Sequence, residues 1–151
     1  MKKSFIAAAI CCLLISCGQK DKSELSESTV QSPILVADPT IFYAQGEYYL
    51  YGTGGTSDFG FPVYVSDDLK TWRLPASPAN GYALKKGDAF GTQGFWAPQV
   101  FEYKGRFYMA YTANEQIAIA SSDHPSGPFK QDVLAPLASE FRQIDPYVFF
   151  D

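Results

Sequence analysis

The sequence predicts an all-β domain that forms part of a β-propeller. From Pro33 onward, β-branched and aromatic residues alternate between Gly, Pro and Asp, and no stretch has a helical period. The segment Asp38–Thr53 (DPTIFYAQGEYYLYGT) overlays Ala97–Thr112 (APQVFEYKGRFYMAYT) without a gap, and a third copy begins at Asp145. The starts, at positions 38, 97 and 145, are 59 and 48 residues apart, which suits the four-stranded unit of a propeller, called a blade. Two blades and the first strand of a third are therefore expected.

Residues 1–17 predict a bacterial lipoprotein signal. Two lysines precede an apolar run at 5–15, which is too short to span a bilayer, and the sequence LISC that ends at Cys17 has the form of a lipobox. Cleavage before Cys17 leaves this cysteine as the lipidated amino terminus, and more than one acyl chain gives a stable anchor. The alternative is an ordinary signal peptide with an incidental cysteine.

Residues 18–32 are polar and charged, which predicts a flexible tether between the lipid and a domain at 33–151. No cysteine follows Cys17, so the domain has no disulfide and no thiol chemistry. Without the two lysines of the signal, 10 basic residues face 16 acidic ones, a net charge of −6. This charge argues against nucleic acid or an anionic membrane surface as a partner and favours a neutral ligand. Contact with a membrane is expected only through the lipid anchor.

Each unit is expected to contain four strands. The first two are joined by a hairpin at Gln45-Gly46 in the first unit and at Lys104-Gly105 in the second. Pro62–Trp72 and Ala118–Phe129 then both read as a strand, a Ser-Asp turn and a closing aromatic residue. Trp72 and Phe129 are expected to pack inside the blades rather than bind a ligand.

The first residue of each repeat is expected at the mouth of the central channel, because the innermost strand of a blade lines that channel. Proline follows this residue in all three copies, where a strand loses no ladder hydrogen bond. Proline also favours an extended backbone in the residue before it. Asp38, Ala97 and Asp145 should therefore be extended and converge on one place, and two of the three are carboxylates.

The three openings carry a resemblance to a known family. Their sequences are Ala37-Asp38-Pro39-Thr40, Phe95-Trp96-Ala97-Pro98-Gln99-Val100 and Ile144-Asp145-Pro146-Tyr147-Val148. Together with the Ser-Asp turns, they resemble the blade-opening motifs of glycoside hydrolase family 43. The resemblance implies a five-bladed propeller that cleaves plant-derived α-L-arabinofuranosides or β-D-xylosides with inversion at the anomeric carbon.

The resemblance also implies roles for three residues. Asp38 corresponds to the general base, which accepts a proton from water. Asp145 corresponds to a third carboxylate, which orients the general acid and raises the pKa of that acid. Trp96 corresponds to an aromatic residue that stacks on a sugar ring. The competing interpretations are that Asp-Pro only starts a strand and that Trp96 packs between neighbouring blades.

The family's general acid is a glutamate that opens a later blade, and no matching segment occurs in this sequence. Glu102, Glu115 and Glu140 have the wrong phase in the repeat, because they lie in an inner strand pair, near a hairpin and in a loop. We therefore expect a fragment of an enzyme of roughly 300 residues, scaling five blades by the repeat length. The fragment alone is expected to be inactive and prone to aggregate.

Two other functions compete with this interpretation. One is a cell-surface glycan-binding propeller without catalysis, and the other is a retaining fructosidase, whose Asn-Asp-Pro-Asn-Gly motif the residues around Asp38 do not match.

No cofactor is expected, and a structural calcium ion is left open. His124 is expected at the surface rather than on a metal. The expected location is the bacterial cell envelope, with the lipid-anchored domain facing the periplasm or the outer surface. Arabinose or xylose specificity, exo or endo action and the oligomeric state are left open.

Overall fold

The structure is a computed structural model, and the residues that it describes are 29–30, 33–55, 58–78, 80–137 and 140–151. The predicted signal with Cys17 lies outside the described residues, as does most of the predicted tether. Thr29–Val30, inside the stretch expected as tether, form a short strand. The described part of the chain contains no helix that is long and apolar enough to cross a membrane.

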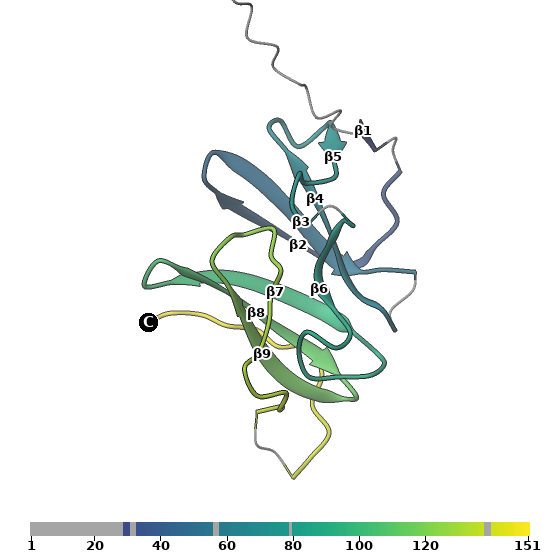
Figure 1. Ribbon diagram of the computed structural model, residues 1–151, viewed down its shortest axis with the longest axis vertical. Coiled ribbons are helices and arrows are strands. Elements are labelled where there is room, and N and C mark those ends of the chain that lie inside the picture. Colours follow the sequence, from purple (N-terminus) through teal and green to yellow (C-terminus); the bar gives the residue numbers. More distant parts are fainter. Residues whose placement is uncertain (1–28, 31–32, 56–57, 79, 138–139) are drawn as a thin grey trace, which may run out of the picture.

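All regular structure in the described residues is β-strand, as the sequence predicts. The strands in chain order are β1 (Thr29–Val30), β2 (Ala37–Ala44), β3 (Glu47–Thr53), β4 (Gly60–Ser66), β5 (Trp72–Arg73), β6 (Tyr82–Lys85), β7 (Trp96–Tyr103), β8 (Arg106–Ala113) and β9 (Gln116–Ser122). They form two antiparallel sheets, which Figure 1 shows one above the other.

The first sheet is the first blade. Its strands lie in the order β1-β5-β4-β3-β2, and β6 pairs with the free part of β4. The hairpin between β2 and β3 turns at Gln45 and Gly46, which have positive φ angles of 53° and 90°. A two-residue turn with positive φ at both positions fits the right-handed twist of the flanking strands. The predicted hairpin and the four consecutive strands β2 to β5 are therefore confirmed.

The second sheet is the second blade and has the order β7-β8-β9. Its first hairpin turns at Lys104 and Gly105, with φ angles of 51° and 75°. The predicted fourth strand is reduced to a single bridge between Ser121 and Lys130. The first blade has its β4–β5 pair, between Val65 and Arg73, at the same point of the repeat.

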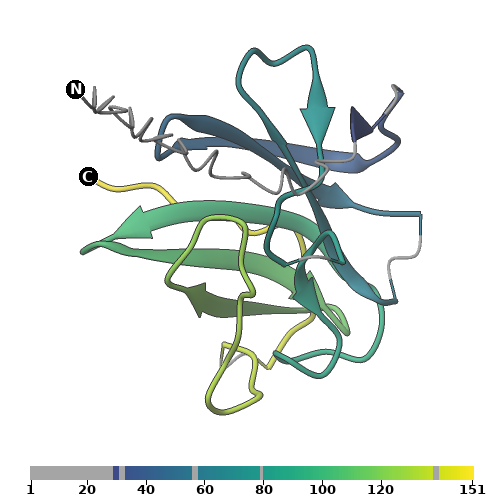
Figure 2. The ribbon, with the colours of Figure 1, turned by 45° about the horizontal axis from the view of Figure 1, so that its top comes forward.

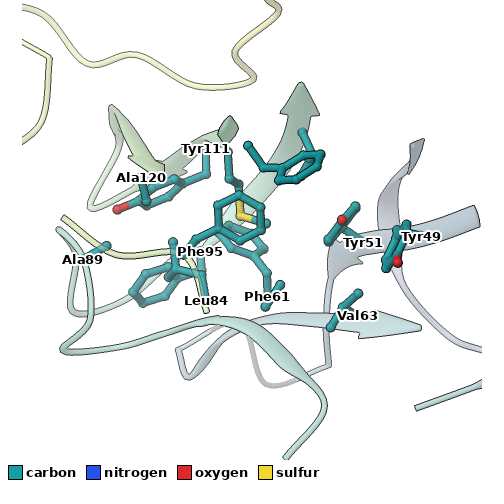
Figure 3. Close-up of a cluster of buried hydrophobic side chains, with 14 of the residues drawn as sticks. Tyr49, Tyr51, Phe61, Val63, Leu84, Ala89, Phe95, Tyr111 and Ala120 are labelled. Atoms are coloured by element: carbon teal, nitrogen blue, oxygen red, sulfur yellow. The ribbon is translucent and has the colours of Figure 1, made fainter. Parts of the chain in front are cut away.

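The core lies where the two blades pack together, and β7 contacts both β2 and β3. Figure 3 shows Phe61 of the first blade beside Phe95 and Tyr111. The ring of Phe61 meets both others edge to face, with centroids 5.8 and 5.5 Å away, and all three side chains are fully buried. Trp72 and Phe129 are also buried, which confirms that they pack inside the fold.

The Ser-Asp turn between β4 and β5 is held by its own side chains. The backbone N–H groups of Lys70 and Thr71 donate to Oδ1 of Asp68 at 2.8 and 2.7 Å. The hydroxyl of Ser66 accepts from the N–H of Leu69 at 2.9 Å. The hydrogen bonds from Thr71 and Lys70 stabilise the charged carboxylate and lower the pKa of Asp68 to about 2.

Candidate active site

The three repeat openings surround one hollow, as the repeat predicts. Asp38 and Ala97 stand near the starts of the inner strands β2 and β7, and Asp145 begins the segment that follows the second blade. The hollow has a volume of about 500 Å³, and the residues that line it are Asp38, Pro39, Thr40, Ala97, Pro98, Gln99, Asp145, Pro146 and Tyr147. Of the carboxylates in the described part of the chain, Asp38 and Asp145 are the two that line it.

The backbone at these openings differs from the expectation. Asp38, Ala97 and Asp145 have φ angles of 48°, 47° and 58°, so the predicted extended conformation is wrong. In β2 and β7 the opening residue and its proline form a β-bulge, in which two residues stand opposite one on the partner strand. In these two bulges the opening residue is left-handed, and this geometry outweighs the local preference imposed by proline. Asp145 has a similar φ although it lies in no strand.

This backbone conformation is unusual for residues other than glycine, and unusual backbone angles cluster at functional sites. Asp tolerates the left-handed region better than most residues, whereas Ala97 adopts it without a polar side chain that could compensate. The same strained geometry at three openings that share one hollow indicates that the fold fixes the direction of these side chains.

Asp38 is held by the last residue of the strand beside it. The hydroxyl of Thr53 donates to Oδ2 of Asp38 at 3.0 Å. The same hydroxyl accepts the backbone N–H of Ala97 at 3.0 Å. One side chain of the first blade therefore contacts both the carboxylate of that blade and the opening of the second.

Asp145 is held in a related way by the second blade. Its backbone N–H donates to the hydroxyl of Thr112 at 3.0 Å. The side-chain amide of Gln99 then makes two hydrogen bonds to the backbone of Val148, accepting from its N–H at 2.5 Å and donating to its carbonyl at 3.1 Å. The segment from Asp145 onward consequently runs along β7 (Figure 2), where the ring of Phe150 packs against that of Phe101.

Trp96 does not line this hollow. It lines a neighbouring one of about 510 Å³, together with Asp58, Gln93, Gly94, Asn114, Glu115 and Arg142. Gly94 lies beneath the indole, because a Cβ at that position would stand 3.0 Å from Cζ2 of Trp96. The half-buried ring is thus set against the backbone, beside a polar surface that includes the ion pair of Glu115 with Arg142.

The three glutamates that the sequence excludes as general acid lie outside the hollow of Asp38 and Asp145. Glu102 is exposed near the far end of β7, opposite Phe107, and Glu115 is paired with Arg142. Glu140 is exposed in the loop before the third opening, and none of these three side chains lines the hollow of Asp38 and Asp145. No group of three or more His, Cys, Asp or Glu residues in the described ranges is placed to hold a metal ion.

His124 is exposed, as expected from its turn. Its Nδ1 lies 2.8 Å from the hydroxyl of Ser126, and its ring meets that of Tyr49 edge to face. These contacts give the histidine a structural role in the second Ser-Asp turn.

Three residues of the candidate site were not singled out from the sequence: Thr53, Thr112 and Gln99. A signal for two of them was present, because the ungapped overlay aligns Thr53 with Thr112. Their partners stand at the opening of the following blade, and a strand pattern does not reveal contacts between blades.

Comparison with known proteins places the chain among glycoside hydrolases. It is 26% identical over 143 residues to the extracellular exo-α-(1→5)-L-arabinofuranosidase of Cellvibrio japonicus, an alignment that covers 92% of this chain and 35% of that protein. It is 30% identical over 135 residues to the xylosidase/arabinosidase of Humicola insolens, covering 78% of this chain and 41% of that protein. The chain therefore spans well under half the length of these curated relatives.

The solved structures agree. The endo-1,4-β-xylanase of Bacteroides thetaiotaomicron superposes with a TM-score of 0.68 and 43% identity, over 77% of this chain and 39% of that chain. The endo-arabinase of the same species superposes with a TM-score of 0.54 and 32% identity, over 70% of this chain and 37% of that chain. The two sheets are thus blades of a five-bladed propeller, of which this chain covers a part.

The match to a family extends over most of the chain. It covers residues 30–151, and these include both blades and all three openings that surround the hollow. The chain therefore belongs to glycosyl hydrolases family 43.

Proposed function

We propose that this chain supplies the first two blades, and the opening of the third, of an inverting glycosidase that acts on α-L-arabinofuranosides or β-D-xylosides. The observation that carries the proposal is the pair of carboxylates, Asp38 and Asp145, in one solvent-accessible hollow at the openings of successive blades. The substrate class follows from the relatives, which are named for activity on arabinose-containing and xylose-containing glycosides.

In the proposed reaction, Asp38 is the general base. Its carboxylate accepts a proton from a water molecule as that water attacks the anomeric carbon from the face opposite the leaving group. A carboxylic acid on the other side of the sugar protonates the leaving oxygen, at a separation of roughly 6.5–9.5 Å that leaves room for the water. We assign that acid to a glutamate in a later blade, outside this chain.

The second carboxylate has a supporting part. Asp145 is exposed in the hollow and its backbone is tied to the second blade, so its negative charge has a defined position. A negative charge near a carboxylic acid favours the protonated form of that acid. We assign to Asp145 the role of orienting the general acid and keeping it protonated. Trp96 lines the second hollow, and we assign to it the role of stacking on a neighbouring sugar ring.

The location is part of the proposal. Two of the relatives are extracellular enzymes by name. The lipobox at Cys17 supports a lipid-anchored protein of the bacterial envelope, with the propeller facing the periplasm or the outer surface.

The experiment uses the complete propeller, made from this chain together with its remaining blades. Hydrolysis of an aryl α-L-arabinofuranoside and an aryl β-D-xyloside is measured for the wild type and for Asp38→Ala. The variant should lose at least about 10²- to 10⁴-fold in kcat, the usual contribution of a general base. Proton NMR of the first product formed should show the inverted anomer.

The matched control is Asp123→Ala, whose carboxylate is exposed at the surface and pairs with Arg106 away from the hollow. It should keep wild-type activity. Full activity in Asp38→Ala contradicts the assignment of the base. A folded wild-type protein that binds oligosaccharides without cleaving any of them supports the glycan-binding propeller instead.

A further inference from the structure

The hydroxyl of Thr53 has a defined hydrogen-bonding pattern. A threonine hydroxyl has one proton to donate and two lone pairs that accept. Here the proton goes to Oδ2 of Asp38, and one lone pair accepts the N–H of Ala97, both at 3.0 Å. We propose that Thr53 is a positioning residue for the Asp38 carboxylate, an inference that rests on the proposed function.

The contact leaves the reacting oxygen free. Oδ2 of Asp38 accepts the threonine proton, whereas Oδ1 has no hydrogen bond to the described residues, and Asp38 is one of the residues that line the hollow. Asp38 is itself exposed, so little packing limits the rotation of its side chain. One hydrogen bond from a residue in the strand pair therefore sets which carboxylate oxygen is presented to water.

The second bond of Thr53 strengthens the first. A hydroxyl that accepts a hydrogen bond becomes a better donor, because chains of hydrogen bonds polarise one another. The donor in this case is the backbone N–H of Ala97, which opens the second blade. The orientation of Asp38 in the first blade is consequently coupled to the docking of the next blade.

The repeat separates the structural part of this arrangement from the catalytic part. Thr112 occupies the same place in the second blade and also accepts the N–H of the next opening residue, Asp145. The residue equivalent to Asp38 is Ala97, which offers no carboxylate to Thr112. Joining the blades is common to both threonines, whereas in these two described blades donation to a carboxylate occurs at Asp38.

The test compares variants of the complete propeller. Thr53→Val removes the hydroxyl and keeps the shape of the side chain, whereas Thr53→Ser keeps the hydroxyl. We expect kcat to fall roughly 10- to 100-fold in Thr53→Val, as for the loss of a hydrogen bond to a charged group that orients a reacting atom, with KM little changed. Thr53→Ser should retain most of the wild-type kcat.

Two further variants show how the threonine acts. Thr71→Val is the matched control, because Thr71 lies in the exposed outer turn, and it should keep wild-type activity. In an Asp38→Ala background, Thr53→Val should cause no further loss, since its effect operates through the missing carboxylate. Thermal melting checks that each variant is folded. If Thr53→Val does not fold, Thr53→Ala replaces it in the same comparison with Thr53→Ser.

The outcomes distinguish this inference from the proposed function. Unchanged kcat in a folded Thr53→Val, or an equal further loss in the Asp38→Ala background, overturns the positioning role while Asp38 remains the base. An Asp38→Ala variant that keeps full activity overturns the proposed function, and the inference with it.

Discussion

Replacing Gly60 by alanine tests how tightly β4 and β6 are joined. Gly60 begins β4 opposite Lys85, with a φ of +131°. A Cβ there would stand 2.0 Å from the carbonyl oxygen of Leu84 and 2.9 Å from Cα of Lys85. These atoms belong to the backbone, so no side chain can rotate to relieve the clash, and β6 has to move away from β4.

The expected loss is the sum of two effects. A non-glycine residue at positive φ costs about 1–2 kcal/mol. Separation of the strands at Gly60 and Phe61 removes about two backbone hydrogen bonds, each worth about 1 kcal/mol. Gly60→Ala should therefore lower the free energy of unfolding by about 3–4 kcal/mol.

Gly46→Ala is the matched control. Gly46 also has a positive φ, of +90°, but no atom lies within 4 Å of the Cβ position. Only the backbone strain of about 1–2 kcal/mol applies to this variant. Urea unfolding of the complete propeller, followed by tryptophan fluorescence, measures both. With a slope of about 3 kcal/mol per molar urea, the midpoint should fall by about 1 M for Gly60→Ala and about 0.5 M for Gly46→Ala. Equal shifts would refute the reasoning from the clash.

Two other substitutions test single polar contacts. Tyr111→Phe removes a buried hydroxyl that donates to the carbonyl of Phe90 at 2.7 Å, and the variant should lose about 1–2 kcal/mol in urea unfolding; an unchanged midpoint would contradict this. Asp68→Ala removes a carboxylate whose pKa is lowered from 3.8 to about 2 by hydrogen bonds from the N–H groups of Thr71 and Lys70. Because the charged carboxylate makes these bonds, its contribution to the stability of the fold is present above pH 3.8 and is lost as the pH falls towards 2. Melting curves between pH 7 and pH 2 should show that the variant is less stable than the wild type at neutral pH and that the two melting temperatures converge near pH 2. A difference in melting temperature that does not depend on pH would exclude the charged carboxylate as the cause.

The sequence predicts the strands and hairpins of the blades because these depend on short-range patterns. The overlay places hairpins at Gln45-Gly46 and Lys104-Gly105, and both occur there, since two-residue turns with positive φ suit these residues. The repeat also predicts that Asp38, Ala97 and Asp145 meet, because equivalent strands of a propeller begin at the same place.

What the sequence does not predict depends on contacts between blades. The preference of the residue before proline for an extended backbone is real, but the bulge at the start of β2 and β7 outweighs it. The bond between Thr53 and the opening of the next blade joins residues 44 positions apart, and no strand pattern indicates it. Trp96 immediately precedes Ala97, yet it lines a different hollow from the one that the three openings surround.

The hydrogen bonds that hold the third opening also bear on the order of folding. Thr112 and Gln99, which bind the backbone of Asp145 and Val148, belong to the second blade and precede these residues in the chain. In a propeller that folds from its amino-terminal end, these partners are therefore in place before Asp145 joins the structure. Each finished blade then acts as a template for the first strand of the next, and Asp145 takes up its position before the blade that it opens has been made.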